Sequence, residues 1–166
     1  MIVGGVRVVY LGHGLSEATG IVESMLHPKE QGDRSTLAAI YALRLIGLEI
    51  FLPFGENTRY DLVTDDGSRL RRVQCKTGRL RAGAVRFATC SCYGHHRNPK
   101  SARRDYTGEI DDFAVFCPEL GAVYLIPIED VPTRSLGALR VDPPRNGQTK
   151  NIRLAAIYEV ARIDVY

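Results

Sequence analysis

The stretch RYDLVTDDGSRLRRVQCKTGR, residues 59–79, contains the hairpin from which the rest of the chain is interpreted. Residues 59–64 and 70–77 are strand-like, and the sequence DDGS between them is typical of a turn. Side chains alternate along a strand, so Val73 and Cys75 share one face and Arg72, Gln74 and Lys76 the other. The hairpin therefore predicts one apolar and one polar, basic face.

The polar groups of this hairpin suit phosphodiester cleavage. A hard divalent cation prefers oxygen ligands, which the Asp61 carboxylate and the Gln74 amide supply from neighbouring strands. Lys76 shares the strand face of Gln74, so its ammonium can reach the same water or phosphate. Cys75 can offer a metal only its backbone carbonyl, because its side chain faces the core. The alternative is a solvated hairpin with a weak Asp–Lys pair.

Positive charge is concentrated around this hairpin. Residues 57–104 hold 12 Lys and Arg against three acids, although the net charge of the whole chain is only +3. This asymmetry favours a polyanionic partner, most simply DNA, over an ordinary solvated face. The residues expected to contact DNA are Arg59, Arg72, Arg79, Arg81, Arg86, Arg97, Lys100, Arg103 and Arg104.

A helix precedes the hairpin, in KEQGDRSTLAAIYALRLIGLEIF, residues 29–51. Asp33 is expected to cap its start, and Gly47 to end it. Between them Leu37, Tyr41 and Leu45 recur, with Ile40, at helical spacing.

Strands are expected at residues 49–52, 84–90, 113–117 and 123–127, and a tight turn at Asn146-Gly147. Residues 91–109 are a long, basic, turn-rich stretch. One helix followed mainly by strands indicates an α/β sheet with few helices. Residues 1–27 are expected to be an appendage of uncertain structure, and residues 28–166 a single domain.

The four cysteines show no disulfide or standard zinc spacing. Cys75 and Cys117 lie in apolar runs and are expected to be buried. Cys90 and Cys92, with His95 and His96 nearby, leave a weaker zinc-site hypothesis open. No apolar run is long enough to span a bilayer, so a cytoplasmic protein without membrane contact is expected.

Four stretches together resemble the PD-(D/E)xK nuclease superfamily, in the branch of group I intron-associated homing endonucleases, which uses Gln in place of the second acid. They are GDRSTLAAIYALRLIGLEIFLPFGENTRYDLV, RRVQCKTGR, YTGEIDDFAVFCPELGAVYLIPIEDV and NGQTKNIRLAAIYEV. The resemblance covers roughly residues 28–160.

This resemblance implies a restriction-endonuclease-like mixed β-sheet core flanked by helices. It also implies a DNA endonuclease that uses Mg²⁺, with Mn²⁺ as an alternative, and acts as a homodimer or homotetramer. Asp61 would bind the metal, Gln74 would bind or orient it through its amide oxygen, and Lys76 would position the attacking water or stabilise the phosphate charge. The catalytic residues would thus be Asp61, Gln74 and Lys76, with the Cys75 carbonyl as a further metal ligand.

The chain departs from the family pattern on the first helix. Family members commonly carry a Glu four residues after the helix glycine, and counting from Gly32 that position is Thr36. A catalytically weakened DNA-binding protein is therefore the rival hypothesis. Candidates for an auxiliary acid are Glu30, Asp33 and Glu56, followed by Glu109 and Asp111, for which pairing with Arg103 and Arg104 is the alternative.

Overall fold

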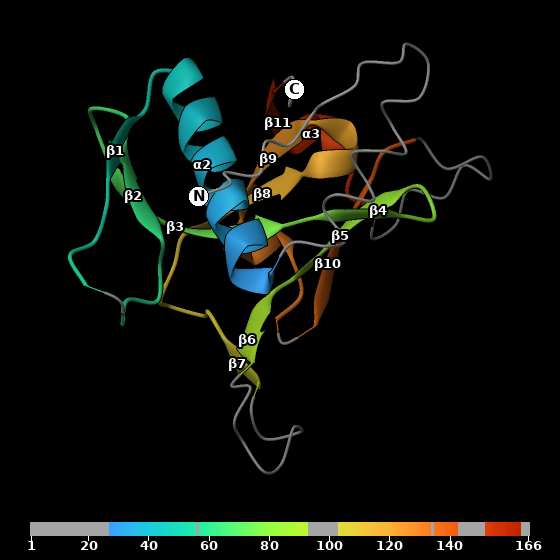
Figure 1. Ribbon diagram of the computed structural model, residues 1–166, viewed down its shortest axis with the longest axis horizontal. Helices are drawn as coiled ribbons and strands as arrows, with labels where there is room; N and C mark the ends of the chain where they lie inside the picture. Colours follow the sequence, from blue (N-terminus) through green and yellow to red (C-terminus); the bar gives the residue numbers. More distant parts are fainter. Residues whose placement is uncertain (1–26, 56, 93–102, 134, 143–151, 164–166) are drawn as a thin grey trace, which may run out of the picture.

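A computed structural model describes residues 27–55, 57–92, 103–133, 135–142 and 152–163. Its main element is a six-stranded mixed sheet (Figure 1). Strands β3 and β8 pair in parallel, and the other neighbours pair antiparallel. In spatial order the strands are β1 (Glu49–Phe51), β2 (Leu62–Asp65), β3 (Leu70–Thr77), β8 (Asp112–Cys117), β9 (Ala122–Pro127) and β11 (Glu159–Arg162).

Two smaller sheets use the chain between β3 and β8 and part of the C-terminal third. Three strands form an antiparallel sheet, and two form a ribbon that projects from the body (Figure 1). The three are β10 (Leu136–Arg140), β5 (Ala84–Ala88) and β4 (Arg79–Arg81), and the ribbon is β6 (Cys90–Cys92) with β7 (Arg103–Asp105). The remaining elements are short: η1 (Pro118–Leu120), η2 (Ile128–Asp130) and α3 (Ala155–Tyr158).

Helix α2 (Pro28–Leu45) starts earlier than the sequence predicts. Its N-cap is His27, whose side chain accepts a hydrogen bond from the Lys29 N–H. Pro28 suits the first helical position, because its fixed φ matches the helix and its missing N–H leaves no donor unpaired. The prediction of Asp33 as the cap is therefore wrong, and Asp33 lies inside the helix.

The end of α2 is confirmed at Gly47. This glycine has φ +88°, and the chain closes with hydrogen bonds from the Gly47 N–H to the Arg44 carbonyl and from the Leu48 N–H to the Leu43 carbonyl. This is the double-bonded helix stop that favours glycine, since the left-handed conformation strains other residues.

The buried side of α2 consists largely of small residues. Ala39, Ala42 and Leu43 are fully buried, whereas Leu37 is 66% and Tyr41 56% exposed. The helix lies close to the sheet, and the Ser35 hydroxyl lies 2.6 Å from the Thr77 hydroxyl of β3. Alanines allow this close approach, so the large apolar residues at helical spacing are displaced to the helix flank.

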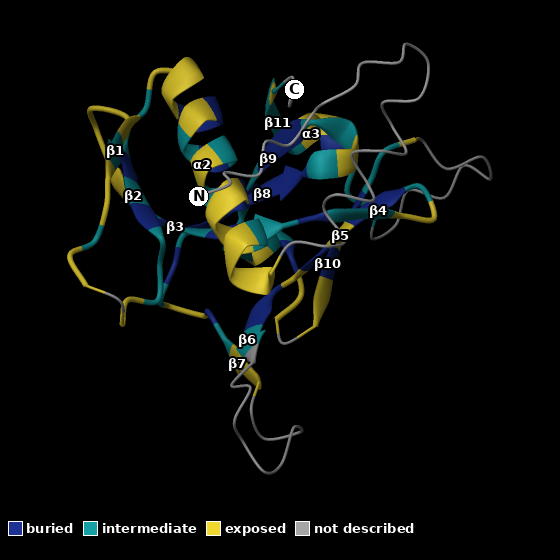
Figure 2. Cartoon of the chain, viewed as in Figure 1, coloured by how far each residue is buried: buried dark blue, intermediate teal, exposed yellow. Residues whose placement is uncertain are grey.

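The sheet has a different cover on each face. Val73 and Cys75 pack with Ala39 and Leu43 of α2, which confirms the predicted apolar face of the hairpin. On the other face Phe113 of β8 packs against Phe87 of β5, with ring centroids 5.9 Å apart. Figure 2 shows the buried residues concentrated along β8 and β9, between these layers.

The predicted α/β class with a mixed sheet is thus confirmed, but flanking by helices is wrong, because α2 covers one face and the β4–β5–β10 sheet covers much of the other. Strand β3 has the predicted limits. Strand β2 starts later than predicted and β5 ends earlier, since β6 follows as a separate strand. Residues 1–26, and with them nearly all of the expected appendage, and the Asn146-Gly147 turn lie outside the described residues. Within the described part, no helix is long and apolar enough to cross a membrane.

Candidate active site

Asp61 is fixed by strand β3. Its N–H donates to the Val73 carbonyl at 2.9 Å, and its carboxylate accepts the Cys75 N–H at 2.7 Å. The Gln74 side-chain amide also donates to Asp61 Oδ2. The hairpin register pairs Leu62 with Val73. Asp61, just before β2 begins, therefore lies beside β3. Asp61 and Gln74 are therefore in direct contact, whereas their predicted role as metal ligands stays a prediction.

The Gln74 amide nitrogen lies between two oxygens suited to a hard cation. It donates to the Asp61 carboxylate and, at 3.3 Å, to the Cys75 carbonyl. A carboxylate and a backbone carbonyl are preferred ligands of Mg²⁺ and related cations. The donor set around Asp61 thus fits a divalent cation, because a rotated Gln74 amide would add its own oxygen.

Lys76 is held by an aromatic residue that is distant in sequence. Its ammonium donates a 2.8 Å hydrogen bond to the Tyr106 hydroxyl and lies 4.8 Å from the centroid of that ring. Tyr106 is only 3% exposed, and it packs edge-on against Phe113. A buried tyrosine with a packed ring gives the Lys76 ammonium a defined position.

Arg59 covers the same tyrosine and has internal partners of its own. Its guanidinium lies 4.3 Å from the Tyr106 ring centroid and donates to Glu109 at 2.6 Å. It also donates to the Ser91 hydroxyl at 2.9 Å and to the Asp105 carbonyl at 2.7 Å. Arg59 thus holds the β6–β7 ribbon against Tyr106. Its expected contact with DNA stays a prediction.

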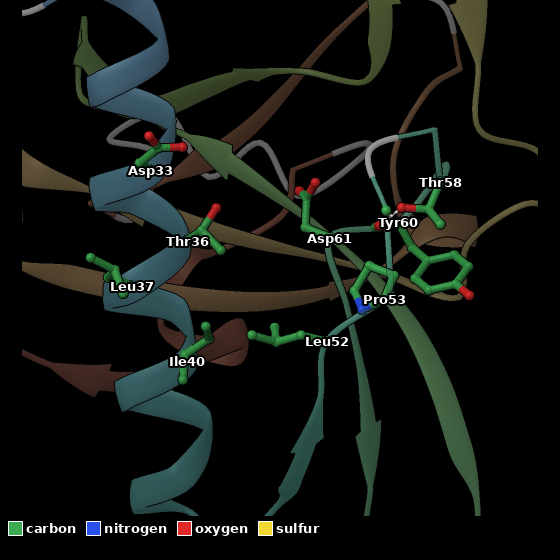
Figure 3. A pocket seen from close by; sticks show the side chains of 10 residues that line it. Asp33, Thr36, Leu37, Ile40, Leu52, Pro53, Thr58, Tyr60 and Asp61 are labelled. Carbon is green, nitrogen blue, oxygen red and sulfur yellow. Dashed lines mark hydrogen bonds between the residues drawn. The ribbon is translucent and has the colours of Figure 1, made fainter.

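A pocket of about 520 Å³ lies between α2 and residues 52–61. Figure 3 shows Asp33 and Thr36 on α2 across from Asp61. Thr36 is the position where the sequence analysis expected a Glu, and Asp33 lies one turn earlier on the same side. Glu30 is exposed outside this lining, and Glu56 lies outside the described residues. Among the proposed auxiliary acids, Asp33 is thus the one that shares a described pocket with Asp61.

The sequence profile described as PD-(D/E)XK endonuclease matches residues 26–161. The chain belongs to this family. The family resemblance seen in the sequence is thereby confirmed.

A solved structure shares the PD-(D/E)XK fold of this chain. Its title is "The structure of a bacterial homing endonuclease: I-Ssp6803I". The match has a TM-score of 0.64 and 22% identity, and covers 81% of this chain and 89% of that one. At this identity the likeness shows the fold alone. No curated protein matches the chain.

Burial is the largest influence on the pKa of two groups at this candidate site. It raises the pKa of Asp61, and the Cys75 N–H and the Lys76 charge partly oppose the shift. Burial also raises the pKa of the Cys75 thiol to about 12, with a smaller opposing effect from a hydrogen bond to Thr36. Cys75 is therefore a buried thiol, and the carbonyl is the group it presents to the site.

The remaining residues expected to contact DNA fall into two groups. Arg72 pairs with Asp111 and donates to the Gly108 carbonyl, and Arg104 pairs with Glu109. Glu109 and Asp111, the two weaker candidates for an auxiliary acid, are thus paired with arginines and lie outside the pocket lining. Arg81, Arg86 and Arg103 are exposed, Arg79 is half-buried, and Arg97 and Lys100 lie outside the described residues.

The zinc hypothesis stays untested. Among the described residues, no three His, Cys, Asp or Glu side chains gather as a metal centre. Cys90 is buried, whereas His95, His96 and the Cys92 side chain lie outside what the structure describes.

The sequence did not reveal the role of Tyr106. This residue precedes an apolar strand, but no spacing rule connects it to Lys76, which is 30 residues away. The two meet because β3 and β8 are parallel neighbours, with Lys76 opposite Val115. Such pairing of distant strands cannot be read from local patterns.

Proposed function

We propose that this PD-(D/E)XK protein is a divalent-metal-dependent DNA endonuclease in which Asp61, Gln74 and Lys76 act together. The supporting observation is that the Gln74 amide nitrogen lies within hydrogen-bond distance of both the Asp61 carboxylate and the Cys75 carbonyl, while the Asp61 carboxylate accepts the Cys75 N–H. The Lys76 ammonium is close enough to lower the pKa of Asp61, against the raising effect of burial.

The Asp61 carboxylate and the Cys75 carbonyl would hold Mg²⁺ or Mn²⁺, with the Gln74 amide oxygen as a third ligand. The Gln74 amide nitrogen lies between these two oxygens. A half-turn of the amide would bring its oxygen there, so that a metal ligand replaces a hydrogen-bond donor. When bound, the cation supplies a water of lowered pKa and neutralises charge on the phosphate. Asp33 faces the site from α2 and adds negative charge to the pocket.

Lys76 acts on the phosphate side of the site. Its ammonium has three donors, and Tyr106 accepts one of them. The remaining donors can hold the attacking water or a non-bridging phosphate oxygen. Stabilisation of developing negative charge by a preorganised donor is a large part of such catalysis.

Duplex DNA is the proposed substrate, and a homodimer or homotetramer is the proposed assembly. One site cuts one strand, so a symmetric pair of sites is the simplest way to cut both. A cytoplasmic setting is proposed from the free-thiol cysteine usage.

A second candidate function is DNA binding without cleavage. Thr36 removes the acid that the family pattern places on the helix, and the described residues offer no cluster of three acidic, His or Cys ligands. The site would then have weak affinity for a divalent cation, because fewer charged ligands offset dehydration of the cation.

Incubation of the purified full chain with plasmid and branched DNA tests the proposal. Cleavage with Mg²⁺ or Mn²⁺, abolished by a chelator, supports the endonuclease. Salt-sensitive binding with no cleavage under either cation supports the second candidate instead.

A further inference from the structure

The β4–β5–β10 sheet has one face that collects arginines. Its register places Arg79 opposite Arg86, and places Ala84 between Arg81 and Arg140. Since side chains alternate along strands, these four arginines share one face. The opposite face, with Val85, Phe87 and Leu139, is part of the core. The face made by Arg79, Arg81, Arg86 and Arg140 is called the arginine face below.

The arginine face is electrostatically unfavourable in the isolated protein. Directly opposite residues of an antiparallel pair have Cβ atoms roughly 5 Å apart, and like charges there are destabilising. Glu119 lies 3.9 Å from Arg79 and offsets part of this repulsion. Arg81 and Arg86 are exposed. A polyanion laid along this face would relieve the repulsion that remains.

The neighbours of these arginines are small. On the same face, Ala84 lies opposite Arg140 and Ala138 lies opposite Arg86. The β4–β5 hairpin turns through Ala82 and Gly83, at φ 50° and 71°. The left-handed conformation is strained for Ala, and Asn is the usual residue there. The tip of the β4–β5 hairpin thus carries no side chain larger than a methyl group. An approaching phosphate backbone would therefore meet the guanidinium groups first.

The arginine face follows the candidate active site in the chain. Strand β3 continues into β4 through Gly78, where an added Cβ would lie 2.7 Å from Val85. Figure 1 shows the β4–β5 hairpin extending away from β3. Arg81 lies five positions after Lys76, which at the rise of a strand is at most about 16 Å. Along a duplex, phosphates of one strand advance about 3.4 Å each, so this reach is at most about five nucleotides.

We infer that the arginine face binds the phosphate backbone of the cleaved duplex within about five nucleotides of the scissile phosphate. This inference rests on the proposed function and gives its DNA contact a defined place. It adds Arg140 to the expected DNA contacts, and it assigns Arg79, Arg81 and Arg86 to the same stretch of phosphate backbone.

The test compares full-length Arg81→Gln/Arg86→Gln with the wild type and with Arg162→Gln. Arg162 is an exposed arginine of β11 whose charge pairs with Glu159. Duplex affinity is measured over a range of salt concentrations, together with phosphate-ethylation interference. Two lost phosphate contacts reduce the slope of log affinity against log salt by about 1.8, which at 0.15 M salt is about 30-fold in affinity.

The inference predicts this loss for the double variant, together with weaker interference within about five nucleotides of the cut. Arg162→Gln and the charge-preserving Arg81→Lys/Arg86→Lys keep the wild-type slope. The double Gln variant also melts no lower than the wild type, because removing Arg86 relieves a repulsion.

A double Gln variant with the wild-type salt slope, in a protein whose wild type binds and cuts DNA, overturns the inference and leaves the endonuclease proposal standing. A wild type that binds no duplex DNA, or that prefers RNA, overturns both.

Discussion

The Lys76 ammonium donates a 2.8 Å hydrogen bond to the hydroxyl of Tyr106, a buried residue 30 positions later in the chain. The tyrosine ring is fixed on its other sides by Phe113 and by the Arg59 guanidinium. The position of the Lys76 ammonium therefore depends on three parts of the fold: strand β3, the core, and the β6–β7 ribbon.

Tyr106→Phe removes this hydrogen bond and retains the ring. A hydrogen bond to a charged group contributes about 1.5–3 kcal/mol, so the cleavage rate at saturating DNA should fall at least about tenfold. The KM for DNA should change little, because the ring still packs against Arg59 and Phe113. Single-turnover cleavage measures the rate, and an unchanged rate would show that Tyr106 does not position Lys76.

The pH dependence of cleavage should report Asp61. Burial raises its pKa, so the carboxyl is protonated at a pH where an ordinary Asp is ionised. A protonated carboxyl binds no cation, and activity should fall on acidification earlier than ordinary Asp residues titrate. Higher Mg²⁺ concentrations should move the profile to lower pH, because cation and proton compete. A profile that does not depend on Mg²⁺ concentration would contradict this assignment.

Asp61→Asn should raise thermal stability at neutral pH while it abolishes cleavage. Because the pKa of Asp61 is raised in the folded state, the protonated carboxyl stabilises the fold at a pH below the unfolded-state pKa. This stabilisation is lost as the pH rises through the folded-state pKa. The ionised carboxylate is thus the unfavourable form at neutral pH, and Asn removes the charge. Thermal melts at pH 7 check the sign, and a lower melting temperature for Asn would contradict it.

Asp33 and Thr36 line the pocket opposite Asp61, so substitutions there should change cation affinity in opposite directions. Asp33→Ala removes a carboxylate and should weaken Mn²⁺ binding on the order of tenfold, and Thr36→Glu should strengthen it. Calorimetric titration with Mn²⁺ measures both. Glu129→Ala, an exposed acid on η2 outside the pocket lining, is the matched control. Equal affinities for all variants would place the cation elsewhere.

The ion pair between half-buried Arg71 and buried Asp112 should contribute more to stability than the exposed ion pairs. Asp112 is 2% exposed and accepts two hydrogen bonds from Arg71 across β3 and β8. Asp112→Ala leaves the cation without its partner and should cost about 3 kcal/mol of unfolding free energy. Breaking the exposed Arg162–Glu159 pair should cost less than about 1 kcal/mol. Urea denaturation compares the two, and equal losses would contradict the difference in burial.

The sequence predicted the local parts of the site and missed the distant ones. Asp61 and Gln74 were predicted because a single hairpin register brings them together. Tyr106 and the internal role of Arg59 were not predicted, since Glu109, a partner of Arg59, lies 50 residues away. The basic composition predicted Arg59 as a DNA contact, but composition could not show that its guanidinium also pairs with Glu109 inside the protein.

Helix α2 shows the same limit in packing. Its end followed from Gly47, whose left-handed conformation few other residues adopt. Its buried side did not follow from hydrophobicity, because Ala39 and Ala42 face the sheet and Tyr41 lies outside. Its start was missed because Pro28 and His27 together make a cap that a search for Asp, Asn, Ser or Thr overlooks.

The central claim is that Asp61 and Lys76 belong to one metal-dependent cleavage site. The most direct measurement is cleavage of plasmid DNA with Mn²⁺ by the wild type, Asp61→Ala, Lys76→Ala and the control Arg162→Ala. The account predicts that the first two variants lose at least about 10²-fold in rate while Arg162→Ala cuts like the wild type. Full metal-dependent activity in Asp61→Ala or in Lys76→Ala would contradict it.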